Sequence, residues 1–130
     1  QVIGAGADLF AACWLRVAAP DIKLKMPGWN FELSLGTRRL AKLAGAQAAR
    51  DLLIDTKTLN AQQSLGINLA TDIVEPDQWD QLITETLERA RVLPLRAFRH
   101  ILSLTVTDTR DQDLASIVHS SVSSARKHRT

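Results

Sequence analysis

A turn of very small residues and the acid that follows it are the features of this sequence best suited to chemistry. The turn is the run Gly4-Ala5-Gly6, and it follows Val2-Ile3, an apolar pair that predicts the end of a buried strand. A helix that starts at such a turn leaves backbone N–H groups without internal partners and carries a partial positive charge there. This place could hold a developing oxyanion, while Asp8, one turn further on, could carry a proton.

Each of these two features also has a purely structural interpretation. The small residues around Ala5 could merely allow a tight strand-to-helix turn, and Asp8 could merely be an acid placed favourably at a helix N-terminus. A dinucleotide-binding turn is a third interpretation, since Gly4 and Gly6 follow apolar residues. It is disfavoured because Leu9 stands where the third glycine should be, and because Asp8 would place negative charge where a pyrophosphate should lie.

Length and composition fit one small globular domain of 130 residues with 45% hydrophobic residues. The net charge of +2 and a pI of about 9.0 are not a nucleic-acid-binding signature. The sequence shows no run apolar enough for a membrane span, and its single cysteine allows no internal disulfide. We expect Cys13 to be a small buried residue, and we expect no metal site because the three histidines lack ligand spacing.

Periodicity predicts an α/β segment in the first half of the chain. We expect a helix over 5–13 with Leu9, Ala12 and Cys13 facing inward, then strands over 15–18 and 22–26 and a loop over 27–35. Three further helices are expected over 37–44, 46–54 and 60–67. We expect Thr37 to cap the first and Gly45 to end it, and we expect Asn60 to cap the last. Asn68 is expected to adopt a left-handed conformation.

The character changes near Pro76, where amphipathic helical patterns begin. One face of the first helix carries apolar residues from Trp79 to Ala90, and Pro94 ends that helix. A second helix follows, and Thr109 with Gln112 forms a possible capping box for the last one. The sequence thus divides into an α/β part over 1–75 and a helical part over 76–130.

Several of these segments, in this order, carry a resemblance to a known family. They are the run Gly4 to Ala18, Met26-Pro27-Gly28, Leu33 to Leu40 with its Gly36-Thr37-Arg38-Arg39-Leu40 helix start, and the two runs Asn60 to Leu65 and Leu69 to Val74. The chain resembles the enoyl-CoA hydratase/isomerase (crotonase) family over nearly its whole length. The resemblance implies the C-terminal part of a crotonase-like ββα spiral over 1–75, followed by a helical oligomerisation or lid subdomain over 76–130.

The resemblance implies an enzyme that binds an acyl-CoA thioester and stabilises its enolate. Ala5 would give its backbone N–H to the thioester oxygen and Asp8 would be the acid–base group, as the two catalytic residues. The substrate-binding residues implied are Gly4, Gly6, Gly28, Trp29, Phe31 and Leu33. Gly28 stands where hydratases of the family carry a second Glu, which favours a single-acid isomerase- or lyase-like reaction over simple hydration. The alternative is a non-catalytic, crotonase-like acyl-CoA-binding or assembly subunit.

The resemblance also implies partners. In the family an N-terminal half precedes the Gly4 motif and supplies the other oxyanion donor and most of the coenzyme A pocket. A homo-oligomer, trimer or hexamer, is implied, as are a role in fatty acid metabolism and a cytoplasmic location. We expect no cofactor, since coenzyme A is part of the substrate, and neither a nucleic-acid nor a membrane partner.

Overall fold

The first half of the chain contains two pairs of short parallel strands. The structure, a computed structural model, describes residues 1–27, 36–105 and 108–127. The four strands are β1 (Val2–Ile3), which pairs with β3 (Leu24–Lys25), and β2 (Val17–Ala18), which pairs with β4 (Asp72–Ile73). The strands predicted within 15–18 and 22–26 are therefore confirmed, although each is shorter than expected.

Four helices surround these strands. They are α1 (Ala5–Ala12), α2 (Thr37–Ala44), α3 (Ala46–Ile54) and α4 (Ala61–Gly66). Gly45 separates α2 from α3, as predicted, with a φ of 87°. The prediction that Thr37 caps α2 is wrong, because the N-cap residue is Gly36 and Thr37 is the first helical residue. A glycine serves there because the N-cap has a φ of 59°, a left-handed conformation that favours glycine.

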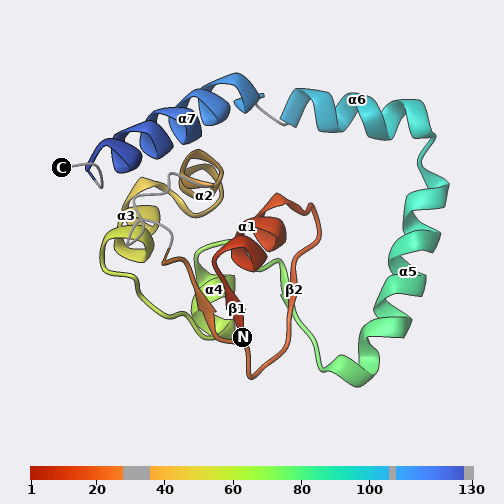
Figure 1. Ribbon diagram of the computed structural model, residues 1–130. Helices are drawn as coiled ribbons and strands as arrows, with labels where there is room; N and C mark the ends of the chain where they lie inside the picture. The colour runs from red at the N-terminus through yellow and green to blue at the C-terminus, as the bar shows by residue number, and fades with distance from the viewer. Residues whose placement is uncertain (28–35, 106–107, 128–130) are drawn as a thin grey trace.

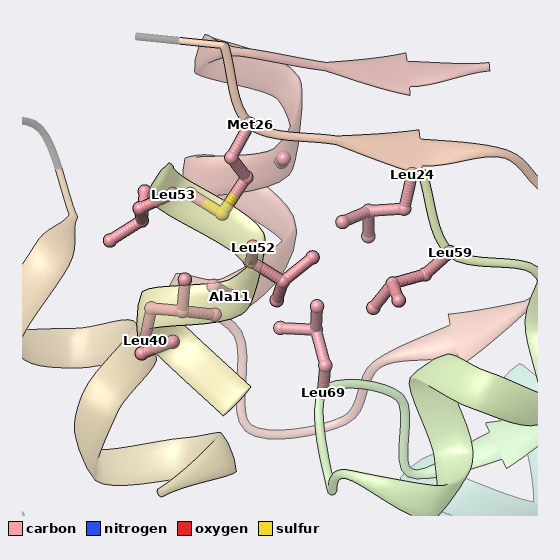
Figure 2. Close-up of a cluster of buried hydrophobic side chains, with 10 residues drawn as sticks. Ala11, Leu24, Met26, Leu40, Leu52, Leu53, Leu59 and Leu69 are labelled. Atoms are coloured by element: carbon pink, nitrogen blue, oxygen red, sulfur yellow. The ribbon is translucent and has the colours of Figure 1, made fainter. Parts of the chain in front are cut away.

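The hydrophobic core lies where α1, α2 and α3 meet β3 and the segments on either side of α4 (Figure 2). Its buried members are all apolar: Ala7, Ala11, Leu24, Met26, Leu40, Ala49, Leu52, Leu53, Leu59 and Leu69. Leu24 is central, since its backbone also exchanges two hydrogen bonds with that of Leu59, at 3.0 and 2.9 Å. The core thereby fixes α1 and β3, which position the candidate site.

Helix α1 turns its smallest residues toward this core. Ala7 and Ala11, four residues apart on one face, are buried. The prediction that Leu9, Ala12 and Cys13 face inward is wrong, because all three are exposed. Two alanines make a flat face that lets the helix pack closely against α2 and β1, and this close approach outweighs the greater hydrophobicity of leucine.

Arg16 joins the end of α1 to the loop after α4. Its side chain is buried, and its guanidinium group donates four hydrogen bonds to backbone carbonyl oxygens. Two acceptors follow α1, Cys13 O at 2.8 Å and Trp14 O at 3.0 Å. The other two follow α4, Leu69 O at 2.8 Å and Asn68 O at 3.0 Å. Two segments more than fifty residues apart are thus held by one side chain.

Helix α4 has the end signals that the sequence predicts. The Asn60 side chain accepts a hydrogen bond from the Gln63 N–H at 2.8 Å, and the Gln63 side chain accepts one from the Asn60 N–H at 3.0 Å. This is a reciprocal capping box. Asn68 has a φ of 60°, which confirms the predicted left-handed conformation after the helix.

The second half of the chain is a series of helices that arches away from the core and returns to it (Figure 1). Its elements are η2 (Pro76–Gln78), a short 3-10 helix, then α5 (Trp79–Val92), α6 (Leu95–Thr105) and α7 (Arg110–Lys127). Neither α5 nor α6 has a buried residue. The apolar face predicted for α5 exists, and in this chain it faces solvent, with Ile83 55% and Leu87 53% exposed.

Among the described residues, two side-chain contacts attach α6 and α7 to the first half of the chain. The rings of Trp14, just after α1, and Phe98 of α6 meet edge to face with centroids 6.0 Å apart. Arg38 of α2 donates through Nη1 to Asp113 Oδ1, Ser116 Oγ and Gln112 O of α7, at 2.9, 3.0 and 3.1 Å. Both contacts reach the neighbourhood of α1 and α2, the two helices of the candidate site.

The start of α7 differs from the prediction. The Thr109 hydroxyl donates to Asp113 Oδ2 at 2.7 Å, so Thr109 is paired with Asp113 rather than with Gln112. This pairing, helped by Arg38, lowers the pKa of the Asp113 carboxyl below its usual value. Within the described ranges, no helix combines the length and the apolar character that a bilayer crossing requires.

Candidate functional site

The site is built on the first turn of α1, directly after β1. The Gly4 N–H donates to Lys25 O of β3 at 3.1 Å, so the end of β1 is fixed to its neighbour. Gly4 then turns the chain with φ 56° and ψ −119°, which a residue with a side chain would adopt only with strain. The predicted strand, tight turn and helix start at Gly4-Ala5-Gly6 are therefore confirmed.

The first backbone donors of α1 have no partner among the residues that the structure describes. The Asp8 N–H is the first of the helix to find an internal partner, Gly4 O at 3.1 Å. Within the described part of the chain, the N–H groups of Ala5, Gly6 and Ala7 have no hydrogen-bond partner, and Ala5 is exposed. Helix starts with free N–H groups favour negative charge. The turn thus presents donors in the place where the sequence predicts an oxyanion site.

Asp8 points from α1 toward the start of α2. Its side chain is half-buried, and a methyl group on Gly36 would overlap its Oδ1 and come within 2.9 Å of its Cγ. Oδ1 is buried, and no hydrogen-bond partner for it exists among the residues that the structure describes. Burial raises the pKa of the Asp8 carboxyl above its usual value, against the opposing positive charge of Arg39.

A raised pKa is what a proton carrier needs. A carboxyl that resists ionisation more readily gives and takes a proton near neutral pH than one that is always charged. Ala5 and Asp8 lie three residues apart, which places them on the same side of the first turn. One helical turn therefore brings together an open backbone donor and a carboxyl whose pKa is raised.

A shallow, open depression of about 540 Å³ lies beside this turn, on the outer side of β1 and α1. Its lining is mostly apolar: Gln1, Val2, Ile3, Gly6, Leu9, Phe10 and Cys13. The expectation that Cys13 is buried is wrong, because the residue is exposed at this depression and its Sγ is 3.4 Å from Leu9 O. Leu9 is 70% and Ile3 49% exposed, so the depression presents apolar side chains to solvent.

The structure brings four of the eight predicted site residues together: Gly4, Ala5, Gly6 and Asp8. The other four, Gly28, Trp29, Phe31 and Leu33, lie outside the described residues. Met26, two residues before the first of them, is buried in the core. Gly36, the first described residue after them, lies beside Asp8.

Gly36 and Arg39 are neighbours of the site that the site prediction did not include. Both belong to the α2 start, which the sequence marks only as a helix following a glycine. Nothing local indicates that this start lies against Asp8, because 28 positions separate Gly36 from it. In the described ranges, no cluster of three or more His, Cys, Asp or Glu side chains could hold a metal ion.

Comparison with solved structures identifies the fold. No family model matches the chain. A structure from Bordetella parapertussis, named as an enoyl-CoA hydratase/isomerase, matches with a TM-score of 0.88 and 32% identity, covering 98% of this chain and 56% of that one. An enoyl-CoA hydratase from Mycobacterium tuberculosis H37Rv matches with a TM-score of 0.82 and 17% identity, covering 99% and 61%. An enoyl-CoA hydratase from Mycobacterium smegmatis matches with a TM-score of 0.76 and 20% identity, and the match covers 98% of this chain and 60% of that one.

These matches confirm the resemblance and the fold class that the sequence predicts. They also show that the chain spans about three fifths of the length of each of these structures.

Proposed function

Because the chain has the fold of the enoyl-CoA hydratase/isomerase (crotonase) family, we propose that it forms part of an acyl-CoA site that stabilises a thioester enolate. The observation that carries the proposal is the first turn of α1, where the open Ala5 N–H and the half-buried Asp8 carboxyl lie together. The N–H donates to the thioester oxygen as negative charge builds on it. Asp8 moves the proton at the α-carbon.

The single carboxyl sets the type of reaction. Addition of water to a double bond is easiest with two carboxylates, one for the water and one for the α-proton. The described residues place one carboxyl, that of Asp8, in the first turn of α1, and the sequence has Gly28 where a second acid would be expected. An isomerase- or lyase-like reaction is thus favoured over hydration. Coenzyme A enters as part of the substrate, and we propose no separate cofactor.

Polypeptide beyond the matched region is needed to complete the site. The Bordetella structure is covered to 56% by this chain, so much of that fold lies outside the match. We propose that the second oxyanion donor and most of the coenzyme A contacts come from such additional polypeptide. The apolar depression at β1 and α1, with Ile3 49% and Leu9 70% exposed, is where it would pack.

Ala5→Pro tests the oxyanion role directly. Proline lacks an N–H, yet position 5 is the first residue of α1, where proline is tolerated because no internal bond is lost. We expect exchange of the α-proton of butyryl-CoA with D₂O to fall about 10²–10³-fold, the usual effect of removing one oxyanion donor. The thermal midpoint should change little.

Ala46→Pro is the matched control. Ala46 is also exposed, also begins a helix and also follows a glycine with positive φ, and it lies on α3 away from the site. Equal exchange rates in the two proline variants would exclude Ala5 as the donor. Binding of butyryl-CoA without any exchange in the unmodified protein would favour a non-catalytic binder, and binding of NAD in its place would favour the dinucleotide alternative.

We further propose that the protein assembles with copies of itself through α5. Five apolar residues of α5 lie on one side of the helix, and all of them but the half-buried Leu82 are exposed, which a monomer in water seldom shows over such a length. The residues on this side are Trp79, Leu82, Ile83, Leu87 and Ala90.

Ile83→Glu should shift the protein toward a smaller species in light scattering, because it places a charge in the middle of this face. Val92→Glu is the control. Val92 is 85% exposed, and because it comes nine residues after Ile83 it lies on the opposite side of the helix. An unchanged mass for Ile83→Glu, or an equal shift for Val92→Glu, would contradict assembly through this face.

A further inference from the structure

We propose that Gly36 is a positioning residue for Asp8: the absence of a side chain at position 36 leaves the space that the Asp8 carboxyl occupies, at the start of α2. The consequence for catalysis rests on the proposed role of Asp8 as the proton carrier. The placement of the carboxyl does not rest on that role, and it can be measured separately.

The contact between the two residues is specific. A β-carbon built on Gly36 would overlap Asp8 Oδ1 and lie 2.9 Å from Cγ and 3.7 Å from Oδ2. Neighbouring heavy atoms do not come as close as 3.0 Å to a real β-carbon, so the carboxyl and a side chain at position 36 exclude each other. Oδ1 is also sealed from solvent. The carboxyl therefore lies directly on the Gly36 α-carbon.

The backbone at Gly36 imposes a second requirement. Its φ of 59° and ψ of 2° place it in the left-handed region, and its carbonyl accepts the first hydrogen bond of α2, from the Leu40 N–H at 2.9 Å. Glycine adopts this conformation without strain. Of the glycines compared, Gly4 and Gly45 also have positive φ, but a β-carbon on either would meet nothing within 4 Å. Only at Gly36 does the conformation coincide with a carboxyl in the vacant space.

The environment of the carboxyl connects this placement to proton transfer. Burial between α1 and α2 raises the pKa of Asp8. The charged group that opposes the rise is Arg39 of α2, three residues beyond Gly36. A carboxyl pushed away from Gly36 would turn toward water, lose the burial and ionise more easily. Gly36 thus sets both the direction of the carboxyl and its readiness to hold a proton.

Gly36→Ala and Gly45→Ala, made in the same protein, separate this role from backbone strain. Both variants place a side chain at a positive φ, but only Gly36→Ala displaces the carboxyl. The measurement is the titration of the Asp8 carboxyl by NMR. We expect the pKa of Asp8 to fall toward its usual value of 3.8 in Gly36→Ala and to stay raised in Gly45→Ala. Unchanged titration in Gly36→Ala would overturn the proposal.

A double variant covers the case in which Gly36→Ala folds poorly. If the overlap is the cause, adding Asp8→Ala removes the group that is in the way, so the double variant should be more stable to urea than Gly36→Ala alone. Gly36→Asn gives a second comparison, since asparagine tolerates the left-handed conformation but still carries a β-carbon. Equal stability of Gly36→Ala with and without Asp8→Ala would also overturn the proposal.

The kinetic measurement distinguishes this proposal from the proposed function. With Asp8 as proton carrier, Gly36→Ala should lower kcat about 10²-fold with little change in KM, because misplacing a reacting group by about 1 Å has that effect. If the titration moves as expected but Asp8→Asn leaves turnover intact, Gly36 still positions Asp8 and the catalytic role of Asp8 fails. If Asp8→Asn abolishes turnover but the titration does not move, the positioning role fails alone.

Discussion

Replacing Arg16 by alanine is expected to lower the free energy of unfolding by about 3–4 kcal/mol. The guanidinium group donates to four carbonyl oxygens, two after α1 and two after α4. A buried carbonyl that loses its partner costs about 1–3 kcal/mol, and water can reach some of the four after truncation, so the sum is smaller than four such losses. Urea unfolding followed by circular dichroism measures the change.

Arg16 is an unusual buried cation. Among the described residues no carboxylate forms an ion pair with it, and burial lowers the pKa of its guanidinium group. Its charge is balanced by carbonyl dipoles, including that of Cys13, the C-cap residue of α1. Lysine carries its donors on one nitrogen and cannot reach both segments, so Arg16→Lys should still lose about 2 kcal/mol.

Arg50→Ala is the control for this prediction. Arg50 lies exposed on α3, and surface substitutions of this kind usually change stability by less than about 0.5 kcal/mol. An equal loss for Arg16→Ala and Arg50→Ala would mean that the four carbonyl contacts contribute nothing measurable.

The elements with strong local signals could be predicted from the sequence. Asn60 before α4, Gly45 between α2 and α3, and Asn68 after α4 all act as their residue types suggest. Each prediction depends only on neighbours along the chain, because capping and left-handed conformations are local properties. The same holds for the turn at Gly4, from which the site was inferred.

The orientation of α1 could not be predicted in this way. Periodicity favoured Leu9 as the inward residue, whereas the helix buries Ala7 and Ala11. Which face is buried depends on how closely α2 and β1 approach, and that distance is not encoded within α1 itself. The contact between Asp8 and Gly36 could not be predicted for the same reason, since it joins residues that are 28 positions apart in the sequence.

The long amphipathic helices show a further limit. The apolar face of α5 predicts burial, and in the single chain it remains exposed, because the pattern specifies that a partner exists and not which surface supplies it. No sequence pattern assigns a role to Trp14. The structure shows that its ring packs edge to face against Phe98 of α6.

Asp8→Asn is expected to reduce turnover about 10²–10⁴-fold, the usual contribution of a general acid–base group. Asparagine has nearly the same shape as aspartate, so it fits against Gly36 without a new overlap. Butyryl-CoA binding, measured by calorimetry, should be largely retained. Loss of binding together with turnover would indicate that Asp8 holds the substrate rather than moving its proton.

The stability of Asp8→Asn decides between the catalytic and the structural interpretation. The pKa of Asp8 is raised in the folded protein from a usual value of 3.8, so the folded state holds the proton more tightly than the unfolded state does. The contribution of the protonated carboxyl to stability is therefore full below about pH 3.8 and is lost as the pH rises through the folded-state pKa. Asparagine never ionises, so it avoids this loss.

The variant should consequently match the unmodified protein in stability at low pH and exceed it at pH 7, when thermal unfolding is followed at both values. An acid whose only role is to favour a helix N-terminus predicts the opposite, a less stable Asp8→Asn at pH 7. Proteins often keep a group that costs stability where function requires it. A variant that gains stability and loses turnover would show that Asp8 is kept in its buried position for chemistry.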